Sequence, residues 1–405
     1  MQATPYLQAA PSGSLGIAAT LDIRRWTIHV LERVTATESI APDDEAGGFS
    51  PGPSDRFVLV RPHGGLNDTL VQLERCRRYA VAYGRILAVD LARSGIRMPF
   101  GSVFRVRPQF GCPVVEANPG VLAALDAMNS VEPAMLQGVL ASYDVAWDPV
   151  VGQVAYGEGR VISFDMTVDH AARCVVHERF GGGMRGALPL RDLALTPQIA
   201  GEVVARLARL GSDYDALHVR YTDYHTDFQR FFARVKPIFA GRRLLVCTDS
   251  AEVQRYAREF FAPDVEVVTN GDVPDLGGEA LHVSSRLDPY RAVVDQFCDL
   301  IAMARARRFL FPLMNDRTSA GRRRISGFSL LVEGLRALPE ITEGLVSLAP
   351  NGELVRMLPR PSLARRVRRL SAELADFVWN NPVYLRRWRV RRLVRDWGKS
   401  TAAGS

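Results

Sequence analysis

The chain has 405 residues, a net charge of +7 and an apolar fraction of 47%, which suits two globular domains and excludes a fibrous or wholly disordered protein. It has no run of 18 or more apolar residues, and its start lacks a basic stretch followed by an apolar one, so we expect neither a membrane span nor a secretory signal. The five cysteines are odd in number and widely spaced, which is typical of reduced core thiols in a cytoplasmic protein.

The first regular elements indicate a βαβ unit. The apolar run FVLV at 57–60 is typical of a buried strand. Residues 68–83 have the spacing of an amphipathic helix, with Asn67 as a predicted N-cap and Gly84 just past its end. A further strand is predicted at 86–91. Strand, glycine loop, helix and strand together predict a parallel sheet.

The rest of the first half is less regular. Residues 121–144 are predicted to be helical with a break at Pro133, and 160–168 and 173–180 have the composition of strands. His170, Cys174 and His177 are close in sequence. In a strand, however, the last two point to opposite faces, so we expect no metal site there.

The second half alternates strands and helices, which predicts a second parallel sheet. Strands are predicted at 216–221, 242–250, 265–270 and 308–313. Helices are predicted at 197–210, 251–261, 289–306 and 326–338, the first of them with Thr196 as N-cap.

The C-terminal end carries the positive charge. Residues 351–405 hold 12 arginines and one lysine against four acidic residues, a net charge of +9 that leaves −2 for the rest. Within it, 363–379 and 384–397 mix arginine with apolar residues and tryptophan. Such helices either pack on the body or lie on anionic lipid at a membrane surface. No recognised nucleic-acid-binding module accompanies them, so nucleic acid is not an expected partner.

Two motifs at strand ends have the chemistry to bind an anionic ligand. Gly64 and Gly65 follow the first strand, where backbone N–H groups and a helix N-terminus favour anions; the alternative is a tight turn without a ligand. His218 and Arg220 share one side of a strand that ends at a predicted ligand crevice. Arg220 can bind phosphate through two hydrogen bonds, and the alternative is an ion pair with Asp223 that holds the loop.

Two further motifs open helices. Thr248-Asp249-Ser250 stands at a strand-to-helix turn, and Ser326-Gly327-Phe328-Ser329 begins the helix at 326–338. Hydroxyl groups and unpaired N–H groups at a helix start suit a diphosphate, whereas the alternative role of both motifs is helix capping.

In order and spacing these four motifs resemble GT-B fucosyltransferases that use GDP-fucose. This family includes α1,6-fucosyltransferases, among them the bacterial nodulation type, and protein O-fucosyltransferases. The resemblance covers roughly residues 56–340. The family has a glycine loop followed by Asn, which Gly64, Gly65 and Asn67 match, and a His-x-Arg-x-x-Asp motif, which His218, Arg220 and Asp223 match. Its Thr-Asp turn is matched by Thr248 and Asp249, and its late serine motif by Ser326, Phe328 and Ser329.

The resemblance implies an α/β fold of the GT-B type, in which two Rossmann-like domains face a cleft, followed here by a basic helical C-terminal tail. The predicted parts are a variable lead-in and linker at 1–55, an acceptor-side domain at 56–195, a donor-nucleotide domain at 196–345 and an arginine-rich tail at 346–405.

The resemblance also implies the reaction, an inverting transfer of fucose from GDP-fucose to a hydroxyl of a glycan, without a metal or another cofactor. Arg220 would bind the β-phosphate and stabilise the departing diphosphate. The serine motif would contact phosphate and base, and Asp249 would lie by the nucleoside. Asp223 and Asp68 are both candidates for the base that the acceptor needs. The alternatives are another nucleotide-sugar donor, or a non-catalytic protein that acts through its basic tail.

Overall fold

The computed structural model describes residues 49–157, 159–224, 226–281, 284–315 and 323–350. The chain divides into two compact units, Met1–Gly47 and Gly48–Ser405, and all described residues belong to the second. Most of the predicted lead-in and tail, including both arginine-rich segments, lies outside the described residues.

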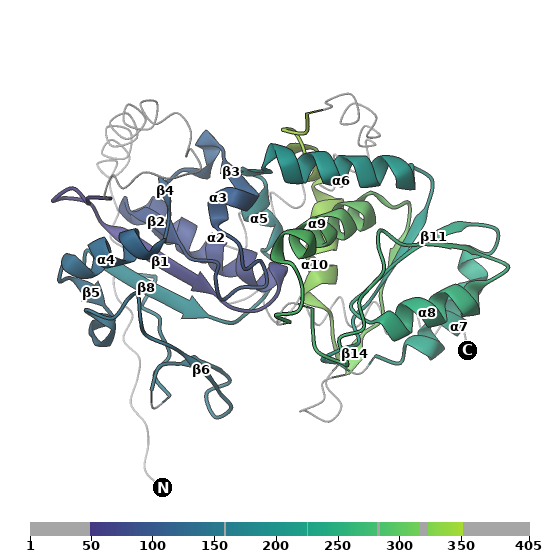
Figure 1. Ribbon diagram of the computed structural model, residues 1–405, viewed down its shortest axis with the longest axis horizontal. Helices are drawn as coiled ribbons and strands as arrows, with labels where there is room; N and C mark the ends of the chain where they lie inside the picture. The colour runs from purple at the N-terminus through teal and green to yellow at the C-terminus, as the bar shows by residue number, and fades with distance from the viewer. Residues whose placement is uncertain (1–48, 158, 225, 282–283, 316–322, 351–405) are drawn as a thin grey trace, which may run out of the picture. The chain divides into compact units, whose positions relative to one another are not determined.

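The first sheet has five parallel strands in the order β4-β2-β1-β8-β5 (Figure 1). They are β1 (Phe57–Pro62), β2 (Ile86–Val89), β4 (Val114–Glu116), β5 (Val131–Glu132) and β8 (Cys174–Arg179). All six residues of the central strand β1 are buried, which explains why its first four, FVLV, are apolar without a break.

Helices and two small antiparallel pairs accompany this sheet. The helices are α2 (Leu66–Tyr83), α3 (Phe100–Val103), α4 (Pro119–Ala127) and α5 (Ala187–Leu190), with single 3₁₀ turns at Pro108–Phe110 and Ala134–Leu136. The pairs are β3 (Phe104–Val106) with β9 (Leu193–Leu195), and β6 (Ala146–Asp148) with β7 (Gln153–Ala155).

The second sheet has four parallel strands in the order β12-β11-β10-β13. They are β10 (Asp215–Val219), β11 (Arg243–Thr248), β12 (Glu266–Val268) and β13 (Phe309–Leu310), and β14 (Met314–Asn315) pairs separately with β15 (Arg323–Arg324). The helices are α6 (Pro197–Leu210), α7 (Phe228–Phe239), α8 (Ala251–Phe261), α9 (Pro289–Arg305), α10 (Gly327–Ala337) and α11 (Pro339–Leu345). Two parallel sheets with helices between strands confirm the predicted α/β class with two Rossmann-like halves.

Three predictions about the first half were wrong. The helix predicted over 121–144 ends at Ala127, because Asn129 adopts a left-handed φ of 49° and Pro133 follows. The strand predicted at 160–168 is irregular: Asp165 accepts the backbone N–H of Thr167 in a local turn.

The third error concerns the start of α2. The helix begins two residues earlier than predicted, with Gly65 as its N-cap, so Asn67 lies inside the first turn. Its end agrees with the prediction, because Gly84 closes the helix in the left-handed conformation with a φ of 61°.

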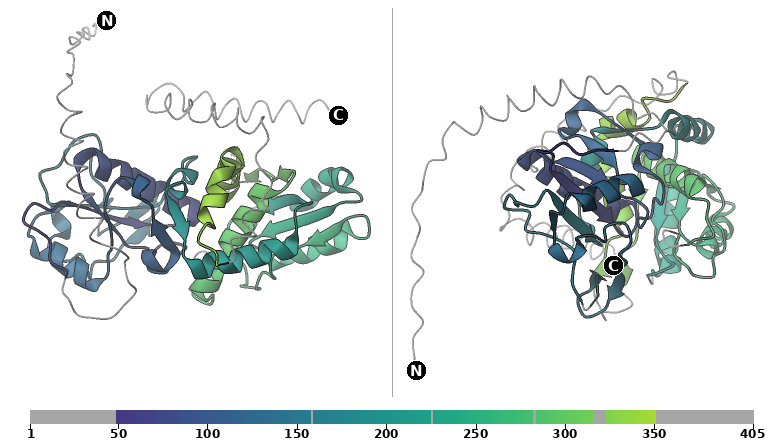
Figure 2. Two further views of the ribbon diagram at one scale, coloured as in Figure 1. Left: turned by 90° about the horizontal axis from the view of Figure 1, so that it is seen from above. Right: turned by 60° about the vertical axis from the view of Figure 1, so that its left-hand side comes forward.

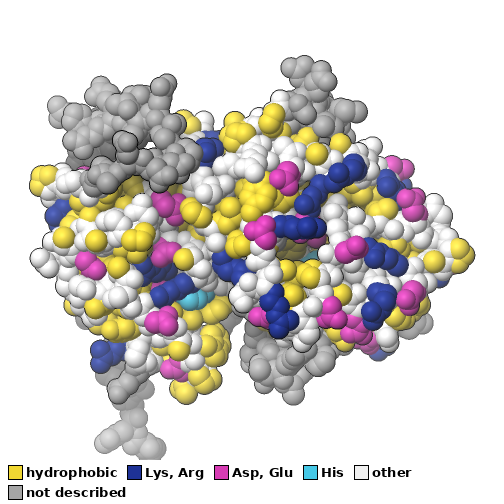
Figure 3. Space-filling model, viewed as in Figure 1, with side chains coloured by type: hydrophobic (Ala, Val, Ile, Leu, Met, Phe, Trp, Pro, Cys, Tyr) yellow, Lys and Arg dark blue, Asp and Glu magenta, His cyan; other side chains and the backbone are white. Residues whose placement is uncertain are grey.

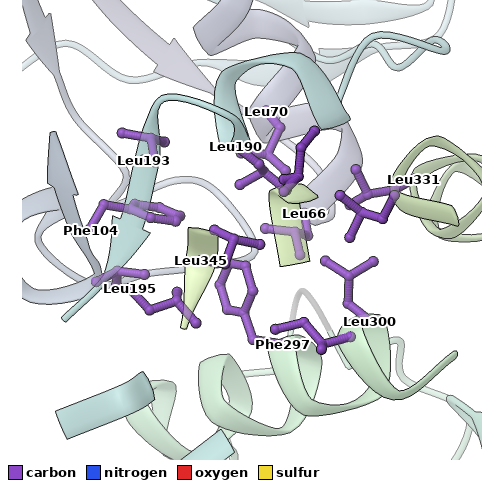
Figure 4. Packing of buried hydrophobic residues seen from close by; sticks show 14 of the residues in the cluster. Leu66, Leu70, Phe104, Leu190, Leu193, Leu195, Phe297, Leu300, Leu331 and Leu345 are labelled. Carbon is purple, nitrogen blue, oxygen red and sulfur yellow. The ribbon is translucent and has the colours of Figure 1, made fainter. Parts of the chain in front are cut away.

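One hydrophobic core joins both halves. It extends from Val58 and Leu70 in the first half to Leu245 and Phe297 in the second. Figure 4 shows its centre, where leucine and phenylalanine side chains of α2, β3, β9, α9, α10 and α11 meet. The last described helices, α10 and α11, lie between the two sheets in the views of Figures 1 and 2. The predicted domain boundary at 195/196 stays a prediction, since this core crosses it.

The five cysteines are buried and free, as predicted for reduced core thiols. Burial raises the pKa of all five, because a thiolate is poorly solvated in an apolar interior. Within the described part of the chain, no helix combines the length and apolar character needed to cross a membrane.

Candidate functional site

The carboxyl ends of both parallel sheets open onto one cavity of about 940 Å³. In parallel α/β sheets this edge is where ligands bind. Nine of the ten predicted site residues line the cavity: Gly64, Gly65, Asn67, His218, Arg220, Asp223, Asp249, Ser326 and Phe328. The tenth, Ser329, is buried and hydrogen-bonded to His218 over 2.7 Å.

Arg220 follows β10 and reaches the cavity with a side chain that is 21% exposed. Its Nε and Nη2 donate to the two carboxylate oxygens of Asp223 over 2.7 and 2.6 Å. Asp249 lies 3.6 Å from Nε. Burial opposes the charge, but the hydrogen bonds to Asp223 and the charges of both carboxylates raise the pKa of Arg220, so the guanidinium stays cationic. Arg220 therefore forms the ion pair with Asp223 that was its alternative role, and it also lines the cavity. Phosphate binding by Arg220 stays a prediction.

Asp68 lies on the other wall of the cavity, in the first turn of α2. Burial raises its pKa to about 6, while the charge of Arg220 and a hydrogen bond from the backbone of Gly65 oppose that shift. The charge of Asp223 raises it further. The two candidate bases thus differ: Asp223 is paired with an arginine, whereas Asp68 is a carboxyl group poised to exchange a proton near neutral pH.

The turn before α2 holds Asp68 in place. Gly64 has a φ of +89°, a conformation that side chains rarely adopt. A Cβ added at Gly64 would stand 2.8 Å from the Asp68 carboxylate and 3.0 Å from the ring of Phe180. This glycine is therefore required both by its φ and by the close approach of two cavity residues.

The start of α10 brings unpaired backbone N–H groups to the cavity. Ser326 is its N-cap residue but makes no side-chain cap hydrogen bond. The hydroxyl of the nearby Ser329 forms a hydrogen bond with the Nδ1 of His218. The rings of Phe328 and His218 pack with their centroids 5.4 Å apart. Burial lowers the pKa of His218 to about 4, so this histidine is neutral at physiological pH.

Asn67 joins the first turns of two helices. A Cβ at Gly327, the first residue of α10, would stand 3.1 Å from its Nδ2, which donates to the carbonyl of Gly183 over 3.2 Å. The buried Oδ1 of Asn67 has no hydrogen-bond partner within the described residues. The N-termini of α2 and α10 therefore lie side by side at one cavity, where their dipoles add to a field that favours an anion.

Asp249 has a local structural role at the cavity wall. Its carboxylate accepts the backbone N–H of Tyr221 over 2.8 Å and the hydroxyl of Thr222 over 2.6 Å, which fixes the loop after β10. Ser250 in the same motif caps α8 through the N–H of Val253. The capping alternative thus holds for Ser250, and Asp249 orients the segment that carries Arg220.

Several cavity residues lie outside the predicted set. Asp299 on α9 is buried, accepts a hydrogen bond from Asn270 over 2.7 Å and has its pKa raised to about 6 by burial. Trp147 on the hairpin β6–β7 and Phe180 after β8 also line the cavity. Asp299 had a sequence signal, because either Asp295 or Asp299 matches the aspartate that precedes the late serine motif in the family resemblance. No motif or spacing pointed to Trp147, which lies in the short strand β6.

His177 is a core histidine. Its Nδ1 bonds the Ser163 hydroxyl over 2.9 Å and its Nε2 bonds the amide oxygen of Gln72 over 2.8 Å. Burial lowers its pKa to about 3. In the described part of the chain, no group of three or more His, Cys, Asp or Glu side chains is arranged to hold a metal ion.

Comparison with known proteins gives structural neighbours only. No protein-family model matches the sequence, and no curated protein matches it at a significant level. The NodZ alpha-1,6-fucosyltransferase co-crystallised with GDP is similar at 18% identity over 69% of this chain and 92% of its own, with a TM-score of 0.44. Fucosyltransferase NodZ from Bradyrhizobium matches at 19% identity over 69% and 93%, with a TM-score of 0.42. POFUT1 in complex with GDP matches at 11% identity over 70% and 95%, with a TM-score of 0.39.

Proposed function

We propose that this protein is a glycosyltransferase that takes fucose from GDP-fucose and transfers it to a hydroxyl group of a glycan. One observation carries the proposal: a cationic arginine and an uncapped helix start lie on one wall of a cavity, and a carboxyl group with a pKa of about 6 lies on the other. The choice of GDP-fucose rests on the resemblance of the motifs.

The donor diphosphate would bind to Arg220 and the first turn of α10. The guanidinium of Arg220 already donates two hydrogen bonds to the Asp223 carboxylate, and a phosphate could be bound in the same two-point geometry. The backbone N–H groups at Gly327 and Phe328 would supply further donors. As the sugar leaves, negative charge develops on the diphosphate, and these fixed donors stabilise it without reorganising.

Asp68 is the stronger candidate for the base. Its carboxylate would accept the proton of the acceptor hydroxyl, whose oxygen forms a bond to the anomeric carbon. The bond between that carbon and the diphosphate oxygen breaks, and the electron pair leaves with the diphosphate. Asp68 belongs to the first half of the chain and Arg220 to the second. The acceptor hydroxyl would therefore attack one side of the sugar while the diphosphate leaves from the other, which fits inversion at the anomeric carbon. No step in this scheme requires a metal or another cofactor.

The first experiment identifies the nucleotide. Thermal unfolding is measured with GDP, UDP, ADP and their sugars, and we expect the largest stabilisation with GDP and GDP-fucose because a ligand that binds only the folded state stabilises it by mass action. Larger stabilisation by UDP or ADP would replace fucose with another donor.

The second experiment tests catalysis through GDP-fucose hydrolysis and transfer. We expect Arg220→Ala to lower the rate about 10²–10³-fold, because it removes a donor to the leaving group. Arg220→Lys keeps the charge but loses the two-point contact and should fall between. The matched control is Arg234→Ala, an exposed arginine of α7 outside the cavity. Activity should persist in EDTA. A wild-type protein without hydrolysis or transfer would favour a non-catalytic role through the basic tail.

A further inference from the structure

The hairpin formed by β6 and β7 carries exposed apolar side chains, and one of them, Trp147, lines the cavity. Trp147 is 56% exposed, Val150 is 94% exposed and Val151 is 44% exposed. Trp147 is the one aromatic side chain among the large exposed apolar residues of the described chain. Figure 3 shows apolar side chains gathered at this hairpin. Exposed aromatic surface beside a cavity is typical of a binding site.

The hairpin is fixed to the body rather than free at its base. The side-chain amide of Gln153 donates to the carbonyl of Phe180 and accepts its N–H, both over 2.9 Å. Val154 is buried, and Tyr156 packs edge-on against Tyr143 with ring centroids 5.9 Å apart. The backbone of the turn is held as well, because the Asp148 carboxylate accepts the N–H groups of Val150 and Val151. Trp147 is therefore presented by an ordered support.

A line of contacts joins Trp147 to the proposed base. The Trp147 ring meets Phe180 edge-on, with centroids 5.6 Å apart and planes at 84°. Phe180 and Asp68 lie on the same side of Gly64, since a Cβ added there would stand 3.0 Å from the Phe180 ring and 2.8 Å from the Asp68 carboxylate. The indole and the carboxylate thus flank one short stretch of the cavity wall in the first half, facing the wall that carries Arg220.

We propose that Trp147 binds the acceptor by stacking against a pyranose ring of an oligosaccharide. This inference rests on the proposed transferase function. The apolar C–H face of a pyranose stacks on an aromatic ring, while its hydroxyl groups point outward. A sugar placed on Trp147 would direct a hydroxyl toward Asp68. A lipid surface fits less well, because Trp147 lines the cavity together with Gly152 and Gln153 instead of pointing only to the exterior.

Saturation-transfer NMR tests this inference, with chitotetraose, maltotetraose and mannotetraose as probes and GDP present. We expect transfer to the ring protons of at least one probe, a dissociation constant raised about tenfold by Trp147→Ala, and near-normal binding with Trp147→Phe. The control Val150→Ala changes an exposed residue of the same hairpin outside the cavity and should bind normally.

Three results would overturn the inference. The first is the absence of saturation transfer to every probe, and the second is equal binding of the probes by wild type and Trp147→Ala. The third is binding of wild type to vesicles of phosphatidylcholine and phosphatidylglycerol that is lost in Trp147→Ala and Val150→Ala, which would assign the hairpin to a membrane surface. Stabilisation of the same wild-type sample by GDP tests the donor site separately, so a failed donor site and a failed acceptor site give different results.

Discussion

At the scale of single residues, two carboxylates in one cavity have different chemistry. Asp223 is held by Arg220 through two hydrogen bonds, which engage both of its carboxylate oxygens. Asp68 is mainly desolvated, and this burial brings its pKa to about 6. The two carboxyl groups therefore suit separate roles in catalysis.

The pH dependence of the reaction should follow Asp68. A base acts in its ionised form, so we expect kcat/KM for transfer to rise about tenfold per pH unit below pH 6 and to level off above it. Asp68→Asn should remove this rise together with most of the activity. Initial rates between pH 4.5 and 8 measure the profile. A profile that is flat in this range, or unchanged in Asp68→Asn, would assign the base elsewhere.

Stability serves as the control for that variant. Because the folded-state pKa of Asp68 is raised above its ordinary 3.8, folding binds its proton more tightly, and stability falls as pH rises from about 4 to 6. Asparagine has no such charge to bury. Asp68→Asn should therefore be at least as stable as wild type at pH 7, so a loss of activity there cannot come from unfolding.

At the scale of elements, the turn between β1 and α2 determines where Asp68 stands. We expect Gly64→Ala to lower the free energy of unfolding by about 1–3 kcal/mol, because alanine meets a positive φ and two close neighbours. Gly65→Ala is the matched control, since nothing lies within 4 Å of its Cβ position and its φ is not positive. Urea denaturation of both variants measures the difference. Equal stabilities would show that the turn adjusts without strain.

The elements also show what could be predicted from sequence. Long periodic segments such as α9, and apolar runs such as β1, were predicted correctly because one face or both are buried. The helix α7 was not predicted although it is amphipathic, because Pro237 falls inside it. The residues on opposite cavity walls were predicted from the family resemblance of their motifs and from the tendency of ligands to bind at the carboxyl ends of parallel strands. Trp147 could not be predicted, since its place depends on the contact between the hairpin and Phe180.

At the scale of the whole described unit, the cavity depends on a core that both halves share. The helix α11 follows the second sheet in sequence, yet Leu345 packs in the same cluster as Phe104, Leu195 and Phe297. A polar contact supports it: the Arg107 guanidinium, beside β3, donates to the carbonyl of Gly344 over 2.6 Å. The walls that carry Asp68 and Arg220 are thereby held by one continuous packing.

This shared core predicts that both sheets unfold together. We expect Leu345→Ala, which truncates a fully buried side chain, to cost about 2–5 kcal/mol and to move a single transition to lower denaturant. Leu348→Ala, at a position that is 40% exposed, should cost much less. Hydrogen exchange in β1 and β10, measured by mass spectrometry during a urea titration, compares the two sheets directly. If β10 lost protection in Leu345→Ala while β1 kept it, the halves would be independent domains, and the cavity would be an interface between two separately stable bodies.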